Sequence, residues 1–595
     1  MHAVYANCAL PAGLAPDLLL TDEQSVAAAA PPGCEVVICD ERYDPSHADE
    51  LNVRMALLAS TWTTLGAEDP TLVGGVSAGD LAGREVVHNL LLPAARGVLE
   101  ARAALADREI TRLTTVLDRA APEQHTLIES VLADAFALAA EHPDAERAWS
   151  EDPANAMLVA KYAGPRNARA PEDPPRVRRI GTLLAALANA ASTGRRRPFK
   201  VIVAEYNPTA AFARWLETAA PDVTAVRLRF APDEVAGMLR AGHMALAPYA
   251  GAPAGLAGGV RERLETYCDA HDAALRDAFA VDGVDLYPLL RPRLIEAVVR
   301  HAEWIDRRVR RVDAALERTA PDAVLVPYDQ VVETRLLVRL AQRRGIPTVV
   351  LNDGWKGDDH QREGMTADRA LAISASVAEG YFSRRANVAV TGDPRSDAAT
   401  TVGAPHTGPL RHVLVGSFTF SPIDLACRRS DAETFLASAL DGIARSEQGH
   451  TARITLKLHP ADDPLVYAAV LERHADLDVT VVSTGDVVAM FDDADLYVTT
   501  YSTSLLQAAA AGVPIAYLRV NDQRLYSPFD GEEPVLTGLT ARDGAELARV
   551  IDDPATRDVE AVRARMAWTE RFLGPRDGHC SERVLQALRA AATRG

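Results

Sequence analysis

Apolar runs and amphipathic segments alternate regularly along the second half of the chain. From Asp322, the strand-like runs DAVLVPYDQ and IPTVVLND are separated by a helical segment at Val331–Arg344. Two further apolar runs, at Lys200–Tyr206 and Val223–Phe230, precede them. Alternation of this kind predicts βαβ units and a parallel sheet.

A second alternating series follows Ala398–Pro409, a segment of small polar residues broken by Gly and Pro that has the composition of an interdomain linker. Its strand-like runs are HVLVGSF, RITLKL, DVTVV, DLYVTT and PIAYLRV, and helical segments separate them. The sequence thus predicts an α/β chain with two Rossmann-like domains. We expect an N-terminal lobe over residues 1–400 and a C-terminal lobe over residues 408–595.

The first part of the chain has a different pattern. It contains one strand-like run, Glu35–Cys39, and amphipathic helical segments such as Glu85–Leu105 and Thr126–Ala140. Another helical region spans about Val260–Glu317, and the C-terminal segment is helical as well. We therefore expect helical insertions in the N-terminal lobe, and C-terminal helices that pack back over that lobe.

The net charge and the hydropathy of the chain argue against two classes of protein, general nucleic-acid binders and membrane-spanning proteins. The chain has 595 residues and a formal net charge of −19, which argues against general nucleic-acid binding because such binding neutralises phosphates. No apolar run reaches the roughly 18 residues that span a bilayer, and the N-terminus lacks the basic leader and apolar core of a signal peptide. We expect a cytoplasmic protein without a transmembrane segment, and peripheral membrane contact stays open. The sequence has no heptad array that would indicate an oligomeric state.

Three groups of polar residues follow predicted strands, where parallel sheets bind ligands. The first is Asn352-Asp353-Gly354 at the end of IPTVVL, with Lys356 shortly after it. A carboxylate that faces a cleft there can accept a proton from a substrate hydroxyl. Asp-Gly is also a common turn pair, so a turn without a catalytic role is the alternative.

The second group is Lys457-Leu458-His459-Pro460. Side chains alternate along a strand, so Lys457 and His459 share one face, and Pro460 ends the strand there. Two cation-capable side chains on one face suit a phosphate leaving group. A structural histidine is the alternative.

The third group is Thr500–Ser504, before the helical run SLLQAAAAG. Hydroxyls and free backbone N–H groups at a helix N-terminus can hold an anion, and simple N-capping by the same hydroxyls is the alternative. Gly416 and Ser417 end the first strand of the C-terminal lobe and can approach a phosphate. Asp492-Asp493 lies in a helix-to-strand turn, where acidic residues are ordinary, so no metal site is expected.

The order of these groups resembles that of bacterial GT-B sialyltransferases and of the capsule-synthesis Kdo transferases that use CMP-linked donors. The stretches LKLHP and TYSTSLLQAAAAGVP are similar to the capsule proteins and also to CDP-glycerol glycerophosphotransferases. VTGDPRSD looks like the segment that closes the first lobe in several GT-B families. The resemblance covers about Asp322–Val520 and is absent near the N-terminus.

The resemblance implies a GT-B fold and an inverting, metal-independent and cofactor-free transfer of a sialic acid- or Kdo-like sugar from a nucleotide donor to a hydroxyl acceptor. It implies that Asp353 is the general base and that His459 assists the leaving phosphate. The residues implied to bind that phosphate are Lys457, Ser502, Thr503, Ser504, Gly416 and Ser417. The residues implied to contact acceptor or donor are Gly354, Lys356, Glu205, Asp329 and Gln507.

Two positions depart from the pattern of these families. Asn352 stands where the first acid of the acidic motif is expected, and Gln507 stands where many nucleotide-sugar enzymes have a ribose-binding glutamate. The identity of the nucleotide therefore stays open. A CDP-polyol phosphotransferase, a nucleotide-sugar 2-epimerase and a non-catalytic binding scaffold are the alternatives.

Overall fold

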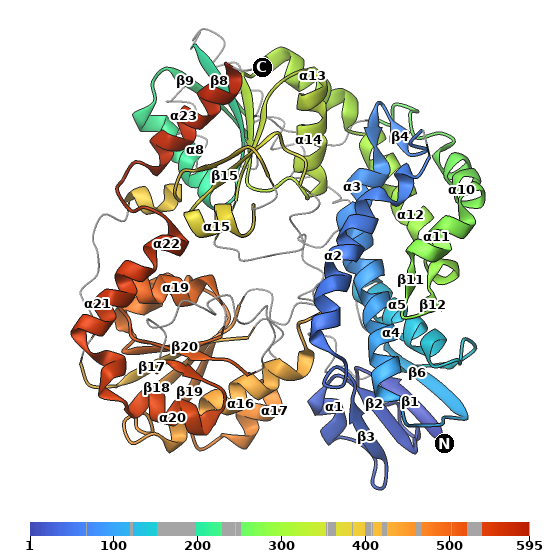
Figure 1. Ribbon diagram of the computed structural model, residues 1–595, viewed down its shortest axis with the longest axis vertical. Coiled ribbons are helices and arrows are strands. Elements are labelled where there is room, and N and C mark those ends of the chain that lie inside the picture. The colour runs from blue at the N-terminus through green and yellow to red at the C-terminus, as the bar shows by residue number, and fades with distance from the viewer. Residues whose placement is uncertain are drawn as a thin grey trace.

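The protein, seen in a computed structural model, contains three parallel α/β sheets, which lie in a first, a middle and a C-terminal domain (Figure 1). The α/β fold with Rossmann-like middle and C-terminal domains is as predicted. The structure describes residues 1–66, 68–119, 123–151, 198–228, 244–245, 252–352, 354, 365–382, 385–398, 406, 408–418, 425–459, 467–500, 502–520 and 538–593.

The first domain has a five-stranded sheet of order β3-β2-β1-β6-β7. Its strands are β1 (His2–Ala6), β2 (Leu18–Thr21), β3 (Glu35–Ile38), β6 (Arg112–Asp118) and β7 (Glu146–Ser150). Its helices are α1 (Gln24–Ala28), α2 (Pro45–Thr61), α3 (Ala78–Val86), α4 (Leu92–Ala104) and α5 (Glu123–Ala139), and a π-helical turn, Val87–Leu91, joins α3 to α4. Of these strands, the sequence pattern indicated only β3. The strands β1, β2 and β6 are almost wholly buried, so they lack the alternation of a half-exposed strand.

The middle domain has a seven-stranded sheet of order β10-β9-β8-β13-β14-β15-β16. Its strands are β8 (Phe199–Ala204), β9 (Val223–Leu228), β10 (Met244–Ala245), β13 (Ala323–Val326), β14 (Thr348–Leu351), β15 (Arg369–Ala372) and β16 (Val388–Val390). Its helices include α8 (Pro208–Ala219), α14 (Val332–Arg343) and α15 (Ala375–Glu379). The predicted strands and the helix α14 are thus present, with bounds that differ by a few residues.

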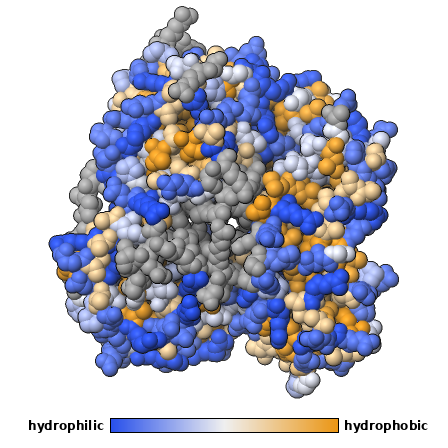
Figure 2. Space-filling view, viewed as in Figure 1, coloured by the Kyte–Doolittle hydropathy of each residue, from blue (hydrophilic) through white to orange (hydrophobic). Residues whose placement is uncertain are grey.

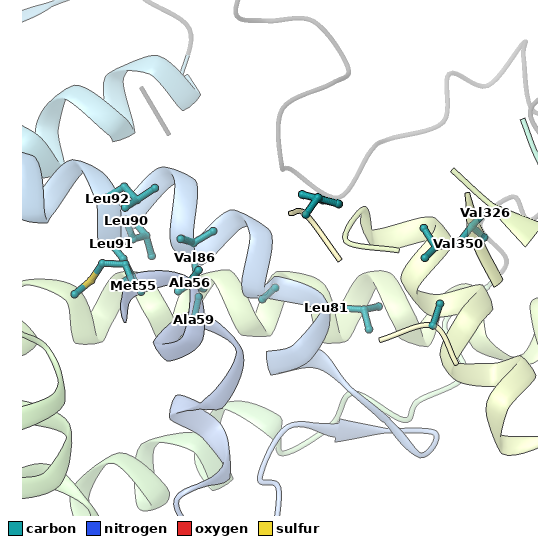
Figure 3. Packing of buried hydrophobic residues seen from close by; sticks show 14 of the residues in the cluster. Met55, Ala56, Ala59, Leu81, Val86, Leu90, Leu91, Leu92, Val326 and Val350 are labelled. Atoms are coloured by element: carbon teal, nitrogen blue, oxygen red, sulfur yellow. The ribbon is translucent and has the colours of Figure 1, made fainter. Parts of the chain in front are cut away.

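A helical layer joins the first and middle domains. It consists of α10 (Val260–Ala270), α11 (Asp272–Ala278), α12 (Tyr287–Asp306) and α13 (Val309–Thr319), with a short hairpin of β11 (Ala280–Val281) and β12 (Val284–Asp285) before α12. The helix α3 packs against both α12 and α14. Figure 3 shows apolar side chains of α2, α3 and α4, among them Met55, Leu81 and Leu92, in the same cluster as Val326 and Val350 of the middle sheet. The two domains therefore share one hydrophobic core.

The C-terminal domain has a six-stranded sheet of order β19-β18-β17-β20-β21-β22. Its strands are β17 (His412–Gly416), β18 (Arg453–Lys457), β19 (Val479–Val482), β20 (Leu496–Thr499), β21 (Ile515–Leu518) and β22 (Thr540–Ala541). Its helices are α16 (Arg429–Arg445), α17 (Ala468–Arg473), α18 (Val487–Met490), α19 (Thr503–Ala510), α20 (Gly544–Asp552), α21 (Val559–Trp568), α22 (Glu570–Leu573) and α23 (Cys580–Ala592). The last helix, α23, packs on β13 and α8 of the middle domain, which confirms the predicted return of the C-terminal segment (Figure 1).

The face of the molecule that Figure 2 shows is mostly hydrophilic. On the face shown in Figure 2, apolar residues gather chiefly on the right-hand side, over the first domain and the helical layer. Among the described residues, no helix combines the length and the apolar character needed to cross a bilayer.

Candidate functional site

The C-terminal sheet has a topological switch point between β17 and β20. The chain continues from β17 to β18 on one side, and from β20 to β21 on the other. Ligands of open parallel sheets bind in the crevice at such a point, outside the carboxyl ends of the strands. Gly416 ends β17 and Ser417 follows it, Lys457 ends β18 and His459 lies two residues beyond it, and Ser502 follows β20. The three groups that the sequence indicated for this lobe therefore meet at one edge of one sheet.

Tyr497 and Thr499 support this edge from β20. A Cβ atom at Gly416 would collide with the hydroxyl of Tyr497 and would lie 3.0 Å from Thr499 Oγ1, so only glycine fits there. The hydroxyl of Tyr497 hydrogen-bonds Ser504 Oγ at 2.7 Å. Burial raises the pKa of Tyr497, so this hydroxyl stays protonated. Sequence reasoning missed both residues, although their spacing of two on β20 places them on one face of the strand.

The N-terminus of α19 is capped by the side chain of Ser502. Ser502 Oγ accepts a hydrogen bond from the backbone N–H of Ser504 at 2.9 Å and also contacts Ser504 Oγ. The capping role, which was the alternative for this group, is therefore present. Thr503 starts the helix, and the half-buried Gln507 lies one turn further along it.

The ends of β17 and β18 are joined by hydrogen bonds of Ser417. Its backbone N–H donates to Lys457 O at 3.1 Å, and its Oγ accepts from the backbone N–H of His459 at 2.9 Å. Lys457 is buried, and its Nζ donates to Leu458 O at 2.7 Å. His459 is exposed just beyond the strand. Lys457 thus has a structural contact, while His459 stands at the open side of the crevice.

Gly354 brings the middle domain to this edge. An ideal Cβ at Gly354 would lie 4.0 Å from Thr503 Oγ1. Gly354 follows β14, so the carboxyl edges of the middle and C-terminal sheets face each other, which is the GT-B arrangement. Asp353 and Lys356 lie outside the described residues.

Asn352 shapes the turn that contains Gly354. It is buried, its Nδ2 donates to Gly354 O, and its Oδ1 accepts from the backbone N–H of Ile373 at 3.0 Å. A carboxylate could not donate the first of these bonds. The side-chain amide of Asn352, which stands where the resemblance leads one to expect an acid, therefore has a structural role in the turn.

The two acids predicted to contact substrate from the middle domain have structural partners. Glu205 is buried and forms a two-pronged ion pair with the fully buried Arg227 of β9, with Arg227 Nη2 to Glu205 Oε2 at 2.5 Å. Asp329 is also fully buried, and its Oδ2 accepts from the backbone N–H groups of Thr366 and Ala367, each at 2.5 Å. Both carboxylates therefore hold strands and loops of the middle sheet together.

A small open cavity of about 40 Å³ lies where the first domain meets the middle domain. Its apolar lining includes Ala56 and Ala59 of α2 and Val87 of the π-helical turn. Its polar lining includes His88 of the same turn and Gln330, which follows β13. Single π-helical turns are frequent at functional sites. Sequence reasoning missed this small cavity, because its walls come from distant parts of the chain.

Within the described residues, no group of three or more His, Cys, Asp and Glu side chains is arranged to hold a metal ion. Asp493 of the turn before β20 pairs with Arg453.

No protein-family model and no curated protein sequence matches the chain. Solved structures do show likeness. A crystal structure of a putative UDP-N-acetylglucosamine 2-epimerase from Listeria monocytogenes is 14% identical, with a TM-score of 0.41, over 67% of this chain and 97% of that one. MurG of Acinetobacter baumannii is 11% identical, with a TM-score of 0.36, over 66% and 100%. The wall teichoic acid polymerase TagF is 10% identical, with a TM-score of 0.35, over 70% and 94%. Likeness at these identities concerns the fold, whereas chemistry depends on the residues of each site.

Proposed function

We propose that the chain is an inverting, metal-independent glycosyltransferase that moves a sugar from a nucleotide donor to a hydroxyl acceptor. The observation that carries this proposal is the meeting of Ser417, His459 and the N-terminus of α19 at the switch point of the C-terminal sheet, opposite Gly354. A helix N-terminus and a histidine at such a crevice suit a leaving group that is a nucleoside diphosphate or a nucleoside monophosphate. The resemblance of the surrounding motifs favours a donor with an acidic sugar of the sialic acid or Kdo class.

In the proposed reaction, the acceptor oxygen attacks the anomeric carbon while the bond from that carbon to the phosphate oxygen breaks. The nucleotide leaves with the electron pair, and the carboxylate of Asp353 takes the proton of the acceptor hydroxyl. His459 donates a hydrogen bond or a proton to the departing phosphate. Thr503 and the N-terminus of α19 stabilise its negative charge.

A two-step experiment tests this proposal. Thermal-shift measurements with CMP, CDP, UDP, GDP and their sugars identify the donor nucleotide. Turnover of that donor is then compared between the wild type and Asp353→Asn. Base catalysis contributes about 10²–10⁴-fold, so we expect this variant to lose turnover while its nucleotide affinity is retained. Near-normal turnover of Asp353→Asn would contradict the assignment of the base.

The same assay separates the other functions. Incubation with donor and no acceptor isomerises the sugar if the chain is an epimerase, and it leaves the sugar unchanged if the chain is a transferase. Transfer of a polyol phosphate in place of a sugar would identify a phosphotransferase. Nucleotide binding without turnover of any donor would indicate a binding scaffold.

A further inference from the structure

The crossing of the chain from α22 to α23 ties the C-terminal domain to the middle domain on one side. A Cβ atom at Gly574, between these helices, would collide with Ile373 O of the middle domain, so the chain passes close to that domain there. The carboxylate of Asp397, which follows β16, accepts from the backbone N–H groups of Cys580 and Ser581 at the start of α23, each at 2.8 Å. Two domains that are joined on one side only can rotate about that side as about a hinge.

The first domain forms one body with the middle domain. The two share a hydrophobic core, as described above. In addition, Asp80 of α3 pairs with two arginines of α14, with Arg335 at 2.6 Å and with Arg339 at 2.7 Å. Any contact between the first domain and the C-terminal domain therefore ties the middle domain to the C-terminal domain as well.

The first domain holds the backbone that leads into α16. The hydroxyl of Tyr43 donates to Leu425 O at 2.5 Å, and Asn52 Oδ1 accepts from the backbone N–H of Leu425 at 3.0 Å. Arg96 donates to Cys427 O at 2.7 Å and, through its other terminal nitrogen, to the hydroxyl of Tyr43 at 3.0 Å. The side chains of Tyr43, Asn52 and Arg96 are all buried, so water does not compete for these hydrogen bonds.

The first domain also holds the start of α16 itself. Asp40, which follows β3, accepts from the backbone N–H of Arg429 at 2.7 Å and from Ser430 Oγ at 3.0 Å. The guanidinium of Arg429 pairs with Glu23 at 2.9 Å and with Glu129 at 2.5 Å. The contact thus combines hydrogen bonds to the backbone with ion pairs to a side chain.

The helix α16 carries this contact into the core of the C-terminal domain. Its buried side chains Phe435, Leu436 and Leu440 lie in one hydrophobic cluster with Val413 of β17 and Leu456 of β18. The helix also packs on α20. Because α16 is part of this core, a first domain that holds the start of the helix holds the whole C-terminal domain.

Figure 1 shows the two ties on opposite sides of the C-terminal domain, with α22 on the left and the first domain on the right. We propose that the first domain is a brace that limits the opening of the middle and C-terminal domains about the crossing at Gly574. The brace keeps Thr503 opposite Gly354, since rotation about the crossing would separate the two domains at that edge. This inference concerns the arrangement of the domains alone and does not depend on the proposed function.

The test measures the separation of the two domains in the full chain by single-molecule fluorescence resonance energy transfer, without nucleotide. The dyes are attached through Ala314→Cys on α13 and Val481→Cys on β19, both exposed positions. The half-exposed Cys34 is replaced by serine, and the other five native cysteines are buried. Opening of the domains appears as a population with lower transfer efficiency.

Two variants weaken the brace from its two sides. Asp40→Ala combined with Tyr43→Phe removes hydrogen bonds from the first domain, and Ser430→Ala removes one hydroxyl from α16 and leaves the first domain unchanged. The matched control is Asp552→Ala. Asp552 accepts from the backbone N–H groups of Glu447 and Gln448, each at 3.0 Å, just beyond the other end of α16 and within the C-terminal domain.

We expect the ratio of open to closed molecules to rise about fivefold in Ser430→Ala, the effect of losing one hydrogen bond, and further in the double variant. Asp552→Ala should lower thermal stability and keep the wild-type ratio. Wild-type ratios in both brace variants would overturn the proposal, and so would an equal rise in Asp552→Ala. If the double variant does not fold, as judged by circular dichroism, Ser430→Ala alone decides.

Discussion

The hydroxyl of Tyr497 occupies the space that a side chain at Gly416 would need. The two residues lie on neighbouring strands at the switch point of the C-terminal sheet. The same hydroxyl hydrogen-bonds Ser504 in the first turn of α19. The absence of a side chain at residue 416 therefore determines how closely β17 approaches the helix that is proposed to hold phosphate.

Gly416→Ala is expected to lower the free energy of unfolding by about 1–3 kcal/mol, because overpacking forces Tyr497 away from Ser504. Nucleotide affinity should fall with it. Thermal unfolding and nucleotide titration measure the two effects. Gly408→Ala is the control, since no atom lies within 4 Å of its Cβ position. Adding Tyr497→Phe to Gly416→Ala should recover part of the lost stability, and no recovery would show that the hydroxyl is not the obstacle.

Asn352→Asp should destabilise the turn before Gly354, although it introduces the acid that the sequence resemblance leads one to expect there. The carboxylate cannot donate to Gly354 O, and it places a negative charge against that carbonyl. We expect a loss of about 1–3 kcal/mol in unfolding free energy, with reduced turnover. The same substitution at the exposed Asn207 serves as control. Increased activity of Asn352→Asp would mean that the position favours an acid.

Glu205→Ala tests whether this residue has a structural role. It removes the two-pronged partner of the buried Arg227, whose guanidinium keeps only its pair with Glu217, and breaking a buried pair costs up to about 3–5 kcal/mol. Glu296→Ala breaks the half-exposed pair with Arg261 and should cost less than about 1 kcal/mol. Chemical denaturation compares the two variants. A stable Glu205→Ala protein with a raised Michaelis constant for acceptor would instead favour substrate contact.

The contact between the first domain and α16 should make stability depend on pH. Burial, with Asp22 adding to it, raises the pKa of Asp40 to about 8, and burial raises the pKa of Glu23 to about 7 in spite of Arg429. In the unfolded chain both carboxyls lose their protons near pH 4. The folded protein therefore binds more protons between about pH 4 and pH 8, and its unfolding free energy falls as pH rises through that range.

Asp40→Asn should flatten this dependence, because its amide stands in for the protonated carboxyl and can still accept from Arg429 N. Unfolding curves between pH 5 and pH 8.5 provide the measurement. Asp107→Asn, at an exposed site of the first domain, should keep the wild-type slope. An unchanged slope in Asp40→Asn would show that this carboxyl does not bind the extra proton.

The middle and C-terminal sheets could be predicted because their strands are apolar runs of ordinary length between clear helices. Residues at the ends of parallel strands share one edge, so Ser417, His459 and Ser502 could be placed together from the sequence alone. The ion pair of Glu205 with Arg227 could not be predicted, because it depends on the pairing of β8 with β9, which brings Arg227 beside Glu205. The strands β1 and β2 were missed because burial of both faces removes the alternation that identifies a strand.

The hydrogen bonds between the first domain and the start of α16 have a consequence for the synthesis of the chain. Asp40 and Arg429 are 389 positions apart. At the usual rates of translation, roughly 20–80 s pass after Asp40 is made before its partner exists. During that interval Asp40 lacks the hydrogen bonds from Arg429 and Ser430 that it accepts in the folded protein. The hydrogen bonds at this edge of the first domain are therefore completed only after the start of α16 has been synthesised.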